Sequence, residues 1–246
     1  VVNQTRMWFA SHWTVRSGLG WRDGEDHFFR RLLDGSRAAN RLGWQWTSGA
    51  GTGRPYGFAR AQVQRRAPGL CHGCALRASC PIESYPDERE LPVVAPVPGV
   101  RTDDDPARTA GPDTVEHTGT PDAVWITAES LGDSDAALAA HPGLPAVFVF
   151  DAPLLSQLHL ASTRLVFLAE CLADLGTRRE VEVLISDPVS ALHGRRVATT
   201  YTPVPGWRRR SAAIAPVEVH PWPWLVRPHA GSAGSFTAWS KRARVR

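Results

Sequence analysis

Residues 88–121 constrain the fold of this chain most, because they separate two parts of different character. The stretch is rich in Pro, Asp, Thr, Val and Gly and has no sustained hydrophobic period, which is typical of a linker. Tryptophan, arginine and glycine are frequent before it, whereas short apolar runs alternate with Ala- and Leu-rich segments after it. We therefore expect a helical N-terminal domain over residues 1–87 and a second domain over residues 122–246.

The second part alternates predicted strands with helices. Five short apolar runs are of strand type, at residues 123–127, 146–150, 181–186, 197–202 and 217–220. One long amphipathic helix is predicted over residues 154–175. Continuously apolar strands with a helical crossover predict a Rossmann-like parallel sheet covered on both faces. No glycine-rich phosphate fingerprint follows the first strand, so a dinucleotide site is not expected there.

The first part is predicted to be helical. Apolar side chains recur near helical spacing over residues 7–15 and 25–33, and residues 38–46 predict a further short helix. Asp34-Gly35 predicts the end of the second helix, with glycine in the left-handed conformation that helix ends often require. The fold class expected for the whole chain is α/β plus α.

Charge and hydropathy limit the partners of the protein. The 28 Lys+Arg against 24 Asp+Glu give a net charge of +4, which permits a nucleic-acid partner without requiring one. No apolar run approaches the roughly 20 residues of a membrane span, and no signal peptide opens the chain. We therefore expect a soluble, cytoplasmic protein with no membrane partner. Four cysteines are too few for a disulfide scaffold in 246 residues.

Tryptophan is concentrated near the N-terminus, where five of the ten indoles lie within the first 46 residues. Indoles at this density can fill a helical core, relay electrons to a redox cofactor or stack on flat bases. The tryptophan content alone leaves these alternatives open.

The order of the residues around the tryptophans decides between them. The segments NQTRMWFASHW and GWRDGEDHFFRRLLDGSRAANRLGWQW resemble the second half of the FAD-binding helical domain of the DNA photolyase/cryptochrome family. The resemblance implies bound FAD and light-driven electron transfer. If the chain is an enzyme, it also implies a deoxyribodipyrimidine photolyase-like lyase that repairs pyrimidine dimers, with DNA as its partner.

The resemblance implies which residues contact the cofactor. Arg6 and Asp34 are expected to pair beside the isoalloxazine ring, and Asn40 to face the flavin N5 atom. Ser36 stands where the family pattern has a second aspartate, which removes one carboxylate from the ring edge.

The same resemblance assigns electron transfer and dimer binding. Trp44 and Trp21 match the proximal and middle members of the tryptophan chain that photoreduces the flavin. Met7 and Trp46 match residues lining the pocket for the flipped pyrimidine dimer, and Asn3 matches the asparagine near its entrance.

Residues 122–246 resemble the α/β antenna domain of this family, through AVFVFDAPLLSQLHLASTRLVFLAECLADL and VEVLISDPVSAL. In the family this domain precedes the helical one, so the resemblance implies a circularly permuted chain. The first half of the helical domain has no counterpart here. We therefore expect this chain to form one wall of the FAD pocket, completed by a second polypeptide or a homo-oligomer.

The second chemical signal is the spacing Cys71-x2-Cys74-x5-Cys80. Three thiolates in one tight loop can reach one soft metal ion or an iron–sulfur cluster. The segment PGLCHGCALRASCP resembles the last three ligands of the cysteine loop in iron–sulfur DNA glycosylases, which implies a [4Fe-4S] cluster, although the fourth cysteine is missing. A zinc site completed by His72 is the alternative. Cys171 is interpreted as a buried thiol on a helix.

Two other functions stay open beside a light-driven flavoprotein. One is a non-catalytic light or redox sensor that keeps the fold and acts through a partner chain, which Ser36 favours. The other is an iron–sulfur nucleic-acid-binding module without flavin, which the arginines near the cysteine loop favour. The segment at residues 220–224, HPWPW, is interpreted as a packed loop.

Overall fold

The computed structural model describes residues 2–50, 53–86, 105–229 and 239–241, and it divides the chain into two compact units, Val1–Val100 and Arg101–Arg246. The predicted linker lies outside the described residues up to residue 104. Its remainder carries helix α5 (Pro106–Ala110) and strand β1 (Glu116–His117), which the sequence pattern did not predict. No helix in the described part of the chain is both long and apolar enough to cross a membrane.

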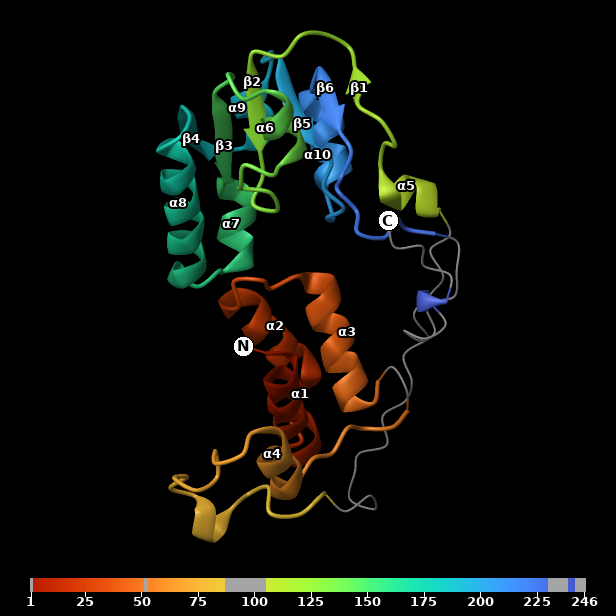
Figure 1. Cartoon of the computed structure of the whole chain (residues 1–246), viewed down its shortest axis with the longest axis vertical. Helices are drawn as coiled ribbons and strands as arrows, with labels where there is room; N and C mark the ends of the chain where they lie inside the picture. Colours follow the sequence, from red (N-terminus) through yellow and green to blue (C-terminus); the bar gives the residue numbers. More distant parts are fainter. Residues whose placement is uncertain (1, 51–52, 87–104, 230–238, 242–246) are drawn as a thin grey trace. The chain divides into compact units, whose positions relative to one another are not determined.

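The first unit is helical, as predicted (Figure 1). Its elements are α1 (Asn3–Ser11), the π-helical turn η1 (His12–Arg16), α2 (Trp21–Arg31), α3 (Arg37–Ser48), α4 (Arg60–Arg66) and the 3-10 turn η2 (Arg77–Ser79). Ala10, Phe28 and Trp44 form a buried cluster in its core, one from each of the three long helices. Burial of this apolar face fixes α1, α2 and α3 against one another, because tertiary packing supplies most of the stability of short helices.

The end of α2 differs from the prediction. The helix stops at Arg31, Leu32 adopts an extended conformation, and Gly35 is not left-handed. The side chain of Leu32 packs against the core, so the chain leaves the helix where this apolar residue turns inward. Gly49 does end α3 in the left-handed conformation, with φ of 82°.

The second unit is a six-stranded, mostly parallel sheet of order β1-β6-β5-β2-β3-β4, which confirms the predicted fold class. The five predicted strands are all present: β2 (Ala123–Ile126), β3 (Ala146–Asp151), β4 (Val181–Ser186), β5 (Val197–Thr200) and β6 (Glu218–His220). They run parallel to their neighbours, whereas the short edge strand β1 pairs antiparallel with β6.

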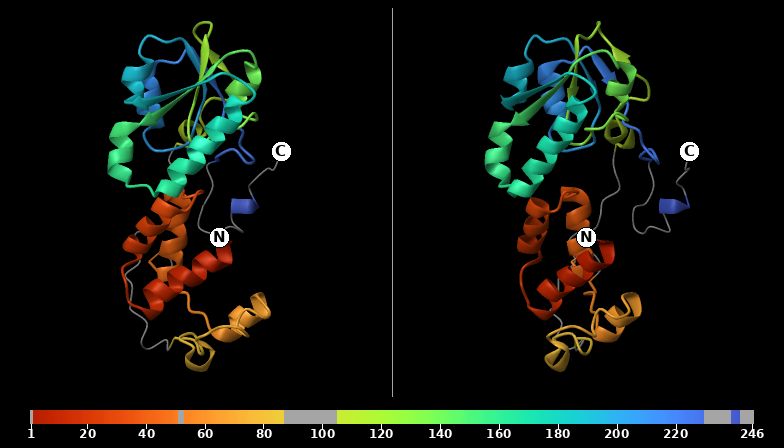
Figure 2. Two further views of the ribbon diagram at one scale, coloured as in Figure 1. Left: turned by 90° about the vertical axis from the view of Figure 1, so that its left-hand side faces the viewer. Right: turned by 60° about the vertical axis from the view of Figure 1, so that its left-hand side comes forward.

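Helices cover both faces of this sheet (Figure 2). Alternate side chains of β2 and β3 point to opposite faces. Val124 and Phe148 pack on one face with residues of α6 (Ala136–Ala140) and α8 (Ser162–Gly176). Trp125 and Val147 pack on the other face with residues of α9 (Pro188–Leu192) and α10 (Trp207–Ile214). The core of the unit is therefore two apolar layers with the sheet between them.

The prediction of a single long helix over residues 154–175 is wrong. Two helices occupy this stretch, α7 (Ala152–Leu158) and α8, and the chain breaks between them where His159 adopts a left-handed conformation with φ of 49°. Neither glycine nor proline marks the break in the sequence. The spacing of apolar residues therefore predicted one continuous helix across it.

Candidate functional site

Arg6 of α1 and Asp34 of the loop before α3 form the predicted ion pair. The Arg6 Nη2 atom donates to Asp34 Oδ2 at 2.7 Å and to Oδ1 at 3.0 Å. This hydrogen bond, opposed by partial burial, holds the pKa of Asp34 below its ordinary value. The Asp34 side chain is 66% exposed, so its carboxylate is open to a ligand while Arg6 fixes its position.

Asn40 lies in the first turn of α3 and connects that helix to α2. Its amide nitrogen donates to the backbone carbonyl of Glu25 at 2.7 Å, and its backbone N–H donates to the carbonyl of Ser36 at 3.0 Å. The amide oxygen of Asn40 has no hydrogen-bond partner among the described residues. Ser36 precedes α3 and is exposed, and its hydroxyl does not cap the helix.

Trp44 is buried in the centre of the helical unit with 1% of its surface exposed. Its ring contacts Phe28 and Trp13 edge-on, with centroids 5.2 and 6.3 Å apart. The indole N–H of Trp44 has no hydrogen-bond partner within the described part of the chain. Trp21 packs against the same cluster from the start of α2.

The sequence analysis assigned no role to Trp13, although it is the indole in direct ring contact with Trp44. Its Nε1 donates to the carbonyl of Gly20 at 3.0 Å, which fixes the ring beside α2. Helical spacing placed Trp13 on the apolar face of the first helix but gave no indication of this contact, which depends on how the helices pack.

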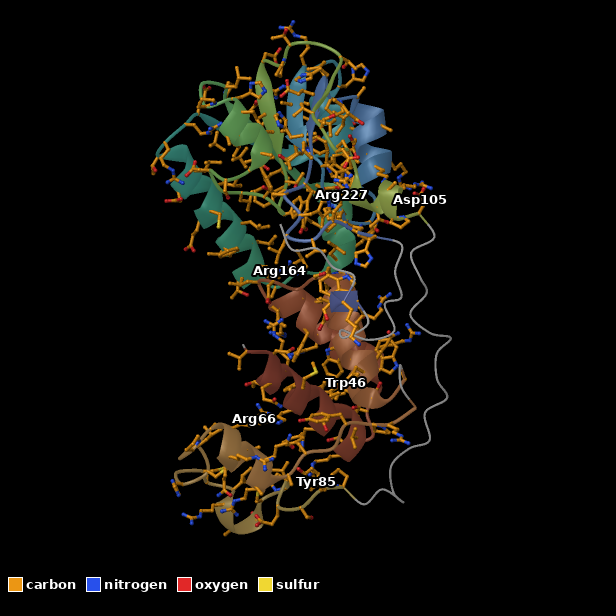
Figure 3. The ribbon with its side chains drawn as sticks, turned by 45° about the vertical axis from the view of Figure 1, so that its right-hand side comes forward. Trp46, Arg66, Tyr85, Asp105, Arg164 and Arg227 are labelled. Carbon is orange, nitrogen blue, oxygen red and sulfur yellow. The ribbon has the colours of Figure 1, made fainter. Side chains whose placement is uncertain are left out.

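The three residues predicted for dimer binding lie on α1 and α3. Met7 packs against α3, where its sulfur accepts a hydrogen bond from Thr47 Oγ1 at 3.4 Å. Trp46 is 46% exposed, and Figure 3 shows its side chain on α3. Its ring lies 5.0 Å from that of Tyr56, which the sequence analysis did not single out. Asn3 is exposed at the first residue of α1.

The cysteine loop is tied to the helices by two arginines. Arg16 of η1 donates to the backbone carbonyls of Pro81 at 3.1 Å and Ser84 at 2.6 Å. Arg60 of α4 pairs with Glu83 at 2.7 Å, and this pairing raises the Arg60 pKa, with smaller contributions from Cys80 and Cys71. Both thiols therefore lie within electrostatic reach of one guanidinium.

The three loop thiols do not form a ready metal site in this structure. Cys71 and Cys80 are half-buried and Cys74 is exposed, and all three are free. Among the described residues, one group of three potential ligand side chains has its ligand atoms within 4.8 Å of one another, and that group lies in the second unit. The iron–sulfur cluster, and the zinc site with His72, stay predictions. Cys171 is half-buried on α8.

Comparison with protein families finds a match within the helical unit. Residues 1–65 match the family model for the FAD binding domain of DNA photolyase. Among curated proteins, the deoxyribodipyrimidine photo-lyase of Vibrio cholerae is 47% identical over 55 residues, which are 22% of this chain and 12% of that protein. Those of Streptomyces griseus and Escherichia coli are 46% and 44% identical over 50 residues, which are 20% of this chain and 11% of each relative.

No solved structure matches the chain. The matched segment spans about a tenth of the length of these curated relatives, and it contains each residue that the sequence analysis assigned to flavin, electron transfer or dimer binding. Residues 1–65 of this chain are therefore related to the FAD-binding domain of the DNA photolyase family.

Proposed function

We propose that this chain is a photolyase-like flavoprotein whose helical unit holds part of an FAD site and supports light-driven electron transfer. The observation that carries the proposal is the ion pair between Arg6 and Asp34, formed within a segment that matches the photolyase FAD-binding domain. A charge-assisted pair with an open carboxylate suits the polar edge of a flavin ring, which carries both donors and acceptors.

The residues present fit one side of a flavin. Arg6 and the exposed carboxylate of Asp34 would hold the polar ring edge, and the free amide oxygen of Asn40 would accept a hydrogen bond from it. Ser36 offers a hydroxyl where the family pattern has a carboxylate, so the environment at that edge is less negative. When bound, FAD supplies the light absorption and the one-electron chemistry.

The indoles of this aromatic cluster would serve as the electron path. Trp44 and Trp13 are in ring contact, and Trp21 packs on the same cluster, so the aromatic cluster extends from the centre of the unit to the start of α2. Because Trp44 is almost fully buried, a charge formed there is screened little by water. The family resemblance assigns Trp44 as the indole nearest the cofactor.

Trp46 and Met7 would receive a base taken out of the DNA stack. The half-exposed ring of Trp46, supported from behind by Tyr56, offers a flat apolar surface of the kind on which bases stack. Repair of pyrimidine dimers in DNA is therefore the activity that we propose for the loaded protein.

The remaining contacts to FAD come from outside the matched segment. Because that segment corresponds to about a tenth of a photolyase, we propose that a second polypeptide or a second copy of this chain completes the pocket. A light or redox sensor that signals through such a partner is the second candidate, and the replacement of a ring-edge carboxylate by Ser36 favours it.

Two measurements test the proposal most directly. Absorption spectra of the full chain, purified aerobically and anaerobically, show whether it carries flavin. The chain is then titrated with FAD, and quenching of flavin fluorescence gives the affinity. Arg6→Gln should weaken binding about tenfold, as expected for the loss of one charge-assisted hydrogen bond. Arg30→Gln, in an exposed ion pair with Asp26 on α2, is the matched control and should bind FAD as the unmodified chain does.

Illumination of dimer-containing DNA then separates the two candidates. Repair by the flavin-loaded protein supports the lyase, whereas photoreduction of the flavin without repair supports the sensor. Equal FAD affinity of Arg6→Gln and Arg30→Gln would remove the assignment of the site.

A further inference from the structure

Strand β6 carries a buried carboxylate and a buried imidazole on one face of the sheet. Glu218 and His220 are two residues apart, so their side chains project to the same side of the strand. They are 4% and 5% exposed. His220 Nε2 is in hydrogen-bond contact with Glu218 Oε1.

A second imidazole reaches the same oxygen from a different element. His141 follows the last residue of α6, and its Nε2 atom lies 2.6 Å from Glu218 Oε1. The rings of His141 and His220 are perpendicular, with centroids 5.9 Å apart, so their nitrogens converge from two directions. The side chain of His141 is 23% exposed, which leaves a path for a small ion.

A third imidazole contacts the other carboxylate oxygen. His117 of β1 lies directly opposite Glu218 in the antiparallel register, and its Nδ1 atom is 3.1 Å from Glu218 Oε2. Its side chain is 62% exposed, so it closes the cluster on the solvent side. Three histidines from three elements thus surround one buried carboxylate.

Both oxygens of the buried carboxylate face imidazole nitrogens. Glu218 Oε1 is in contact with His141 and His220, and Oε2 with His117. Convergence of three ligand atoms within 4.8 Å, for His141, Glu218 and His220, is the arrangement that a metal ion requires. Imidazole and carboxylate together are typical ligands of zinc and other divalent first-row metals.

We propose that His117, His141, Glu218 and His220 form a binding site for a divalent transition-metal ion, for which Zn²⁺ is the probe. In a tetrahedral site with bonds of about 2.0–2.1 Å, ligand atoms stand about 3.3 Å apart, so the contacts of the three histidines with Glu218 must open by less than about 1 Å. The exposed side chain of His117 must also turn inward, because it is not in the group of three whose ligand atoms lie within 4.8 Å of one another. Four protein ligands fill the coordination shell, which makes the ion structural instead of catalytic.

The metal would link two short elements to β6. Strand β1 contains only two residues, and α6 only five. Their ligands would join both to β6 through one ion. The proposal is independent of flavin binding, because every ligand lies in the second unit.

The test must exclude the cysteine loop, which is a competing zinc site. We therefore use the full chain with Cys71→Ser, Cys74→Ser and Cys80→Ser, dialyse it against a chelator and then against Zn²⁺, and measure bound zinc by elemental analysis. One zinc per chain is expected. Adding His141→Ala should weaken zinc binding by more than about 100-fold, because even residues behind the ligands contribute about 10–100-fold. His193→Ala, an exposed histidine after α9, is the matched control and should leave binding unchanged.

A spectroscopic measurement on the thiol-free chain, with circular dichroism beside it, guards against misfolding of the variants. Co²⁺ at this site should give the absorption of a tetrahedral ion with nitrogen and oxygen ligands, and the exposed His117→Ala variant should change that absorption without loss of circular dichroism. The proposal is wrong if the folded thiol-free chain binds no zinc, or if His141→Ala and His193→Ala bind it equally well.

Discussion

The six-membered ring of the Trp44 indole lies against Gly24, so closely that a Cβ on Gly24 would stand 2.8 Å from Cζ2 and overlap two further ring carbons. The missing side chain at this position of α2 lets the largest core residue of α3 reach the centre of the unit. Packing of α2 on α3 therefore depends on a glycine that has no unusual backbone conformation.

Gly24→Ala should destabilise the helical unit by about 1–3 kcal/mol, because the Trp44 ring is enclosed by Phe9, Trp13 and Phe28 and cannot shift freely. Urea unfolding followed by circular dichroism measures the change in the free energy of unfolding. Gly73→Ala, where a Cβ meets no atom within 4 Å, is the matched control. Equal effects of the two substitutions would contradict the packing argument.

Trp44→Phe should slow flavin photoreduction severalfold, since it removes the buried indole that supports the electron path. Transient absorption after a light pulse is the measurement. Trp8→Phe is the control, because Trp8 stacks on Phe58 and is not a member of the Trp44 cluster. Comparison with Trp13→Phe and Trp21→Phe then shows which indole receives the charge next. An unchanged rate in Trp44→Phe would remove this residue from the path.

Arg6→Gln should raise the pKa of Asp34 toward its ordinary value, because the Arg6 hydrogen bond is the main cause of its lowering. A lowered pKa in the folded state contributes stability that is present above the unfolded pKa and is lost as the pH falls through the folded pKa. The stability difference between the unmodified chain and Arg6→Gln should therefore vanish in acid. It should be small at neutral pH, since Asp34 is largely exposed. Carboxyl NMR titration gives the pKa directly, and an unshifted Asp34 resonance in Arg6→Gln would contradict the assignment.

Cys74→Ser should abolish the broad visible absorption of an iron–sulfur cluster in anaerobically purified protein, if the loop holds one. Cys171→Ser, on α8, should leave that absorption intact. His72→Ala separates the two metals, because it should impair a zinc site but leave a cluster with thiolate ligands unaffected. Persistence of the cluster absorption in Cys74→Ser would exclude the loop as its ligand.

The central strands β2 and β3 could be predicted well because each is a continuous apolar run enclosed between two helical layers. The break at His159 could not, since a left-handed residue that is neither glycine nor asparagine leaves no mark in the hydrophobic period. Strand β1 was missed for a related reason, because two exposed residues carry no period at all.

The pairing of Arg6 with Asp34 came from resemblance, and the structure forms it. The contact of Trp13 with Trp44 and the histidine cluster could not be predicted from the sequence, because both depend on how distant segments pack. His141 and Glu218 are 77 residues apart, and only the order of strands in the sheet brings them together. His220 was predicted to end a strand, which the structure confirms, but its contact with Glu218 in this cluster was not predicted.

The position of β1 has a consequence for how the α/β unit can be connected. The first strand of this unit is hydrogen-bonded to its last strand, so the entry and exit of the chain lie at the same edge of the sheet. A neighbouring module attached before β1 or after β6 therefore starts from nearly the same place. Exchanging the order of the two units along the chain would therefore leave every strand pairing of the sheet unchanged.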